Sequence, residues 1–338
     1  MFLYRQFGRI RTITHTHTLP ASFKNIVMKS IEKLKETYHT NYNDKSEFAS
    51  KARLLQSIWR VEKGYDYDKK KNYGNFLDEN FARLSGANFL TKNIFEIVKK
   101  EVENKHIQKK VIQEPRIWNN LLSSQPLAFN LFGELKKDYD LASKVFQELF
   151  PERNIKNVTA IEFEYSPGRR NPKYTGDSSA FDVFIKYKTI DNKKGFFGIE
   201  VKYAEDLNDE PSTHKKTYET ISDKSDIFNL SKLNELKNKP IQQIWRDHLL
   251  ALSLFITNND FDIGDFIYIH QKIKNCEEAI KKYIQTFNFS KDTHFKPLTL
   301  EIITNKIKEH TKNSWIDNFE DRYLKFEKID EACRQQRL

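Results

Sequence analysis

Hydrophobic spacing in the middle of the chain predicts one helix followed by three strands. Over residues 131–150 apolar side chains recur three and four positions apart, which is the period of a helix, and Pro151 follows directly. In residues 158–165 apolar residues alternate with acids, which is the period of a strand with one buried face. Residues 180–187 and 195–203 are rich in Phe, Val and Ile and predict two more strands, joined by a polar turn.

A second helix and a fourth strand follow a long polar segment. Residues 204–239 are polar and poorly periodic, which indicates short helices within an irregular excursion. One apolar stripe over residues 241–255 predicts a helix, and residues 265–270 predict a strand. The C-terminal part predicts a helix at 277–284, a strand at 298–303 and a helix from Trp315 onward. The central order is therefore helix, strand, strand, strand, helix, strand.

The N-terminal third is predicted to be helical, and it shows no constellation of catalytic residues. Apolar residues recur with helical spacing from residue 28 to about residue 111, between Tyr- and Asn-rich breaks. The residues before Glu32 include basic residues but no acid, which fits either an organellar transit peptide or a plain N-terminal extension. We therefore divide the chain into a disordered extension (1–27), a helical N-terminal region (28–114) and a main α/β domain (115–338).

Composition and charge indicate the kind of partner and the cellular compartment to expect for the protein. The formal net charge of +10 favours a polyanionic partner, although a general abundance of lysine would produce the same excess. Cys276 and Cys333 are too few and too far apart for a disulfide framework or a Cys-rich zinc site, so we expect a reducing compartment. No apolar run approaches the roughly 18–20 residues that a membrane helix needs. These features predict a soluble, cytoplasmic protein.

Three polar residues interrupt the two most apolar strands. Asp182 lies in the second strand, and Glu200 and Lys202 lie in the third. Residues two apart in a strand project from the same face, so this carboxylate and this ammonium group would sit side by side. A strand-edge acid and a solvated ion pair are the ordinary alternatives. Because the flanking residues indicate strands buried on both faces, the cost of these charges favours a metal site.

The acids and their surroundings resemble the PD-(D/E)XK nuclease superfamily, which has the restriction-endonuclease-like fold. The resemblance covers residues 115–272 and includes the segments LLSSQPLAFNLF, FEYSPGRR, SAFDVF and EVKYAE, which look like one bacterial branch of these proteins. It implies an α/β fold with an αβββαβ core, a mixed central sheet flanked by helices, and C-terminal α/β additions. The superfamily's proline is absent, because Phe181 precedes Asp182.

The resemblance also implies a chemistry for these residues. Asp182 and Glu200 would bind Mg²⁺, with Mn²⁺ able to substitute, and the carbonyl of Val201 would be a third ligand; oxygen ligands without His or Cys suit these ions. Lys202 would orient or deprotonate the attacking water, or stabilise the charge that develops on the phosphate. Burial beside a metal is expected to lower the pKa of Lys202.

Other candidates come from the helices and loops around the strands. The superfamily often supplies an acid from the first helix, where Glu134 stands, and a glutamine from the later helix, where Gln243 is followed by Arg246. Gln242 is an alternative to Gln243, and an ordinary acid of the first helical turn is an alternative for Glu134. Asp177 competes with Asp182 for the metal, or else positions its loop.

Further charged residues lie on the first strand and on the loop that follows it. Glu162 and Glu164 are within reach of the site in principle. The loop carries Arg169, Arg170 and Lys173 toward the Asp182 strand, so these residues would contact the phosphate backbone, or else form a solvated basic loop.

The sequence thus predicts a Mg²⁺-dependent endonuclease, with DNA preferred over RNA as its substrate. A non-cleaving nucleic-acid-binding subunit of a defence or repair assembly is the alternative from another class, and an RNA nuclease is the nearer one. Because restriction-like enzymes often cut both strands as dimers, the resemblance also suggests a homodimer.

Overall fold

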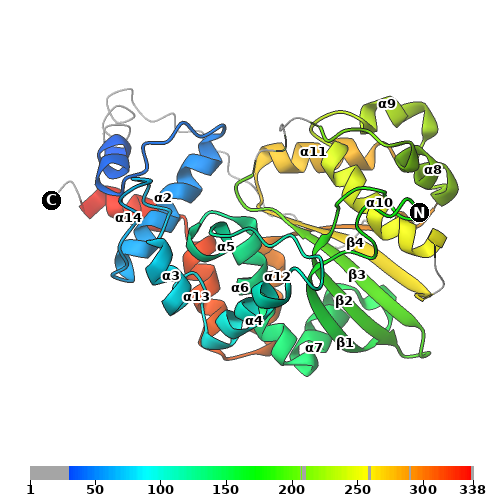
Figure 1. The fold of residues 1–338 in the computed structure, drawn as a ribbon, viewed down its shortest axis with the longest axis horizontal. Helices are drawn as coiled ribbons and strands as arrows, with labels where there is room; N and C mark the ends of the chain where they lie inside the picture. Colours follow the sequence, from blue (N-terminus) through cyan, green and yellow to red (C-terminus); the bar gives the residue numbers. More distant parts are fainter. Residues whose placement is uncertain (1–29, 206, 208–210, 258–259, 289–290, 336–338) are drawn as a thin grey trace, which may run out of the picture.

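A five-stranded mixed sheet forms the centre of the protein (Figure 1). The computed structural model describes residues 30–205, 207, 211–257, 260–288 and 291–335, so the predicted extension 1–27 lies outside the described residues. The strands are β1 (Ile155–Tyr165), β2 (Phe181–Thr189), β3 (Lys194–Val201), β4 (Ile263–His270) and β5 (Phe295–Thr299).

The strands lie in chain order across the sheet, and their directions change at β3. The pairs β1–β2 and β2–β3 are antiparallel, whereas β3–β4 and β4–β5 are parallel. A tight turn suffices to join antiparallel neighbours, but parallel neighbours need a crossover. The long segment between β3 and β4 provides that crossover, and the predicted αβββαβ order with a mixed sheet is confirmed.

Helices cover both faces of the sheet, which explains why its strands are apolar on both sides (Figure 1). We call the two surfaces the α6 face and the α10 face. The α6 face is covered by α6 (Ser124–Lys137), α7 (Tyr139–Leu149) and α12 (Leu300–His310), and the α10 face by α8 (Lys216–Ser225), α10 (Gln242–Thr257) and α11 (Lys274–Ile284).

The predicted N-terminal helices pack against C-terminal helices as well as against the core. Residues 30–37 are helical, and they are followed by α2 (Glu47–Glu62), α3 (Glu79–Ser85), α4 (Lys92–Asn104) and α5 (Arg116–Asn119). Helix α2 contacts α13 (Ser314–Tyr323) and α14 (Glu327–Gln335) (Figure 1). The buried Gln56 amide of α2 donates to the Tyr203 hydroxyl at 3.2 Å, which ties this region to the chain just after β3. The proposed boundary near residue 114 stays a prediction.

Two sequence-based element assignments are wrong, and helix capping explains both. The helix expected over 131–150 is divided at Asp138, whose carboxylate accepts from the backbone nitrogen of Leu141 at 2.8 Å and starts α7. The strand expected over 298–303 ends at Thr299, because that hydroxyl caps α12 by accepting from the backbone nitrogen of Ile302 at 3.3 Å. In the described part of the chain, no helix combines the length and the apolar character that crossing a bilayer requires.

Candidate active site

Two carboxylates meet on the α10 face, where β2 and β3 run antiparallel. Val183 pairs with Ile199, so the next position places Asp182 opposite Glu200. The backbone nitrogen of Val201 donates to Asp182 Oδ2 at 2.9 Å and fixes the orientation of that carboxylate. Side chains directly opposite each other on one sheet face are neighbours, so the register brings the two predicted acids together.

Lys202 completes this arrangement just beyond the last residue of β3. Its Nζ lies 2.6 Å from Glu200 Oε1, and both residues are only 8% exposed. The backbone nitrogen of Lys202 donates to the carbonyl of Ile269 on β4 at 2.8 Å, so the chain stays in register with the sheet as it leaves the strand. The structure therefore places the lysine and the glutamate side by side and buried.

A third acid extends the row of carboxylates across the sheet. On β1, Phe163 pairs with Val183 and Tyr165 pairs with Phe181. Glu164, which lies between them, therefore stands opposite Asp182 of β2. Burial, more than the countercharge of Arg169, raises the pKa of Glu164 above its ordinary value, and the charge of Glu200 adds to the shift. Arg169 Nη2 lies 2.7 Å from Glu164 Oε1 and partly balances it.

The site holds more negative charge than its own cations balance. Burial and then the charge of Glu200 raise the pKa of Asp182 well above its ordinary value, despite the opposing effect of Lys202. Burial alone would lower the pKa of Lys202, but the surrounding carboxylates, led by Glu200, raise it instead. The chain's own charges therefore oppose the lowering that was expected for this lysine.

Asp247 is a residue of the site that the sequence reasoning missed. It lies on α10, is 4% exposed, and Oδ1 accepts from Arg246 Nε and Nη2 at 3.3 Å each. Burial raises the pKa of Asp247 to about 7, and Glu200 contributes to the rise while Lys202 opposes it. An acid between Trp245 and Leu249 on the buried stripe of a helix was the signal available in the sequence.

Glu205 lies beyond Val201, the last residue of β3, and does not continue the strand. Its Oε2 accepts from the backbone nitrogen of Tyr203 at 2.8 Å, and its Oε1 accepts from the backbone nitrogen of Ser124 at 3.1 Å. The chain thus folds back, and Glu205 caps the start of α6 where the Ser123 side chain does not. Its charge helps to raise the pKa of Lys202.

The structure does not bring Glu134 to the carboxylates. Glu134 accepts hydrogen bonds from Thr91 Oγ1 and, at 3.2 Å, from Asn93 Nδ2 at the start of α4. It stands ten residues beyond Ser124 along α6, which is roughly 15 Å at 1.5 Å per residue. Because Ser124 is the end of α6 that contacts Glu205, Glu134 supports α4 at the distant end.

The glutamine candidates lie on the first turn of α10. Gln243 is half-buried, and Gln242 is buried with Nε2 donating to the carbonyl of Ser212 at 3.2 Å. Gln242 is thus engaged in holding the chain before α8. Gln243 stays the predicted glutamine of the site.

The basic residues divide into those held by acids and those left exposed. Arg169 is engaged by Glu164 and by the carbonyl of Ser178, and Arg246 by Asp247. Arg170 and Lys173 are exposed on the loop before β2. The exposed pair is therefore better placed than Arg169 to meet a phosphate backbone.

Asp177 and Glu162 are engaged outside the carboxylate row. Asp177 accepts from the hydroxyl of Tyr218 and from the backbone nitrogen of Ser179, the latter at 2.8 Å, and so anchors the loop onto α8. Although burial alone would raise the pKa of Asp177, these hydrogen bonds lower it. Glu162 forms an ion pair with Lys186 at 2.7 Å. Of the two roles considered for Asp177, its contacts match the positioning of the loop.

A family model described as the PD-(D/E)XK nuclease superfamily matches residues 42–325, which is most of the chain. The chain belongs to the PD-(D/E)XK nuclease superfamily. Neither a curated protein nor a solved structure matches the chain. Membership confirms the resemblance drawn from the segments around Asp182 and Glu200 and accounts for the αβββαβ core.

Nucleases of this superfamily generally use divalent metal ions, and the donor set here suits one. Asp182 and Glu200 offer carboxylate oxygens on one face, and hard divalent cations prefer oxygen ligands. Burial and then the charge of Glu200 raise the pKa of Asp182, and a bound cation would favour its charged form against both effects. The residues present therefore fit a metal ion between β2 and β3.

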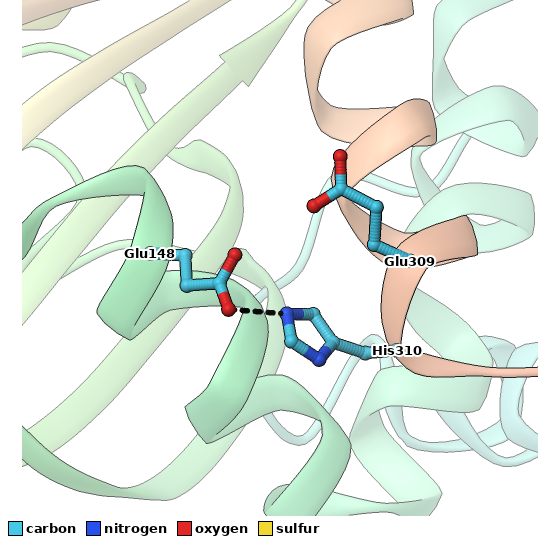
Figure 2. A group of neighbouring side chains, drawn as sticks. All are labelled: Glu148, Glu309 and His310. Atoms are coloured by element: carbon cyan, nitrogen blue, oxygen red, sulfur yellow. Dashed lines mark ion pairs between the residues drawn. The ribbon is translucent and has the colours of Figure 1, made fainter.

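Two other groups of potential metal ligands occur among the described residues. Figure 2 shows Glu148 of α7 facing Glu309 and His310 at the end of α12, with His310 Nε2 3.0 Å from Glu148 Oε1. Lys306 already forms ion pairs with both glutamates, at 2.9 Å to Glu148. This group lies on the α6 side of the sheet, and a lysine supplies the charge that a cation would bring.

The second group contains Asp265, Asp292 and His294. Arg153 occupies it, donating through Nε to Asp265 Oδ2 at 2.6 Å and through Nη2 to Asp292 Oδ2 at 2.9 Å. A guanidinium group already balances these acids, so this cluster is structural.

Proposed function

We propose that this protein is a Mg²⁺-dependent endonuclease that hydrolyses phosphodiester bonds of DNA at Asp182, Glu200 and Lys202. The observation that carries the proposal is that these residues lie together and buried on one face of the sheet. Lys202 Nζ is 2.6 Å from Glu200, and Asp182 lies opposite Glu200 in the register of β2 and β3. Such charges are costly in a structural role, because the same strands are otherwise filled with apolar side chains.

Each residue of the proposed site has a separate task. Asp182 and Glu200 would hold the ion, with the carbonyl of Val201 as a third ligand, and Mn²⁺ would substitute for Mg²⁺. When bound, the ion neutralises the scissile phosphate and makes water nucleophilic near neutral pH. Lys202 supplies a fixed positive charge beside the reacting phosphate and a hydrogen-bond donor that orients the attacking water.

The proposed substrate follows from the charges around the site. The net charge of +10 and the exposed Arg170 and Lys173 before β2 favour a polyanion. Arg246 is about one fifth exposed beside Asp247 and would contact the backbone from α10. Gln243 would lie beside it. We further propose DNA rather than RNA, action in the cytoplasm, and a homodimer when both strands are cut.

A cleavage assay tests this function. Purified protein is incubated with plasmid DNA, single-stranded DNA and RNA, with Mg²⁺, Mn²⁺ or EDTA, beside Lys202→Ala and the distant control Glu134→Gln. We expect metal-dependent conversion of closed circular plasmid to nicked or linear DNA, a loss of roughly 10²–10⁴-fold with Lys202→Ala, and wild-type rates for the control.

Other outcomes separate the alternatives. Cleavage of RNA alone would support the RNA nuclease, and binding to DNA without any metal-dependent cleavage would support a non-cleaving subunit. Equal cleavage by wild type and Lys202→Ala would reject the site itself.

A further inference from the structure

Close to the proposed site, two buried polar atoms on the α10 face have no hydrogen-bond partner. Oδ2 of Asp247 is one, although Oδ1 of the same carboxylate is engaged by Arg246. The hydroxyl of Tyr268 is the other, and Tyr268 pairs in register with Glu200 and is fully buried. A buried carboxylate oxygen without a donor costs free energy. Such a cost is typical of a functional site.

The place of Asp247 suggests what its free oxygen serves. Helix α10 packs on β4 and covers the face that carries Glu200 and Lys202. Asp247 interacts electrostatically with both of these residues, repelling Glu200 and attracting Lys202. Lys202 has its own ion pair with Glu200. Lys202 is therefore held by Glu200, whereas Asp247, whose charge also attracts the lysine, keeps a free oxygen.

Metal binding would change this balance. A divalent ion on Glu200 competes with Lys202 for the same carboxylate, and a buried ammonium group that loses its partner needs another. We propose that Asp247 is a positioning residue that receives Lys202 when a divalent ion binds Glu200. The inference rests on the proposed function for its consequence in catalysis, but the exchange of partners concerns metal binding alone.

If Lys202 exchanges partners in this way, removing the charge of Asp247 should have opposite effects on the stability of the metal-free fold and on metal binding. Without metal, Asp247 is an incompletely paired buried charge, so removing its charge should leave the fold as stable as before or stabilise it. With metal, the loss of Asp247 leaves Lys202 competing for Glu200, so the ion binds more weakly and the lysine is misplaced for catalysis. Residues that orient metal-site groups in this way typically contribute about 10–100-fold to affinity or activity.

The test compares Asp247→Asn with Asp247→Glu, which keeps the charge, and with Asp265→Asn as a control at a fully paired buried acid. Three quantities are measured: the melting temperature in EDTA, Mn²⁺ affinity by calorimetry, and kcat and KM for DNA. For Asp247→Asn we expect an unchanged or higher melting temperature, Mn²⁺ affinity and kcat each lower by roughly 10–100-fold, and an unchanged KM. Asp247→Glu should recover part of both losses, and Asp265→Asn should lower the melting temperature.

The outcomes distinguish this inference from the proposed function. Wild-type Mn²⁺ affinity in Asp247→Asn, or a melting temperature lowered as much as in Asp265→Asn, would overturn the role of Asp247 even if the wild-type protein cleaves DNA. A wild-type protein that binds Mn²⁺ without cleaving any nucleic acid would reject the nuclease, and the affinity comparison would still decide on Asp247. Wild-type protein that binds no Mn²⁺ would overturn both.

Discussion

Two clusters of charge, each built around buried acids, lie on opposite faces of the same sheet, and they are balanced differently. The site cluster (Asp182, Glu200, Lys202, Asp247) lies on the α10 face. The Arg153 cluster (Arg153, Asp265, Asp292) includes Asp265 of β4, whose alternation with Ile267 and Ile269 places it on the α6 face. Both lie among apolar side chains, so the difference between them does not come from burial alone.

The Arg153 cluster is closed by its own partners. Both oxygens of Asp265 accept from Arg153, and Asp292 accepts from Nη2, the same nitrogen that donates to Asp265 Oδ1. Although burial alone would lower the pKa of Arg153, these carboxylates raise it. Complete pairing of this kind satisfies a buried charge but leaves nothing for a ligand.

The site cluster is left open. Asp182 has a raised pKa, and Asp247 keeps an unpaired oxygen, although Lys202 is nearby. The contrast teaches that the balance of charge, rather than the presence of buried acids, separates a candidate metal site from a structural ion pair on the same sheet.

Opening the closed cluster should cost stability and leave catalysis intact. Arg153→Ala leaves Asp265 as a fully buried charge without its partner, so we expect a loss of about 3–5 kcal/mol in the free energy of unfolding, measured by urea denaturation. Below its unfolding temperature the variant should keep the wild-type kcat. A large fall in kcat for folded Arg153→Ala would break the distinction between the two clusters.

The two clusters should shape the pH dependence of stability in opposite directions. The backbone hydrogen bond from His294 and the Arg153 guanidinium lower the pKa of Asp292 to about 2 despite burial, so its stabilisation is present above the unfolded pKa of 3.8 and disappears as pH falls toward 2. Burial raises the pKa of Asp247 to about 7, so stability is lost as pH rises from about 4 through 7.

Urea denaturation in EDTA between about pH 2 and pH 8 covers the loss for Asp292 from about 4 down to about 2 and the loss for Asp247 from about 4 up to about 7, and so measures both contributions. Relative to wild type, Asp247→Asn should flatten the decline toward neutral pH, and Asp292→Asn should flatten the decline toward acid. Parallel curves for wild type and Asp247→Asn would show that this acid is not strained in the fold.

The smallest effect is expected from basic residues that belong to neither cluster. Replacing both Arg170 and Lys173 with Ala removes two exposed cations from the loop before β2 but no buried pair. We expect KM for DNA to rise, kcat to stay unchanged, and the slope of log affinity against log salt to fall by about 2. Arg169→Ala should instead destabilise the loop, because Arg169 pairs with Glu164. If the double variant at Arg170 and Lys173 has an unchanged salt slope, the DNA does not contact these two residues.

The centre of the site was accessible from the sequence because strand alternation is local. A period of two was enough to put Glu200 and Lys202 on one face, and the apolar flanks placed Asp182 on a neighbouring buried strand. The order of elements was accessible for the same reason. One helix was expected over 131–150, but Asp138 lies at the end of α6 and caps the start of α7. Hydrophobic periodicity does not detect a capping residue.

The periphery depends on contacts between distant parts of the chain. Asp247 feels the charge of Glu200, 47 positions earlier in the chain, because of how α10 packs on the sheet, and Glu205 turns back onto Ser124 after the strand has ended. Glu134 had the right residue type on the right helix, but ten residues along α6 carry it to the far end. Spacing along the sequence specifies a face of one element, whereas tertiary packing decides which faces meet.

We propose that the site cluster, and not another group of acids, holds a divalent ion. Calorimetric titration of EDTA-treated, dialysed protein with Mn²⁺ tests it, with wild type compared with Asp182→Asn and with Glu148→Gln from the surface group of Figure 2. We expect saturable binding by wild type and by Glu148→Gln, and its loss in Asp182→Asn. Binding that survives in Asp182→Asn and disappears in Glu148→Gln would contradict it.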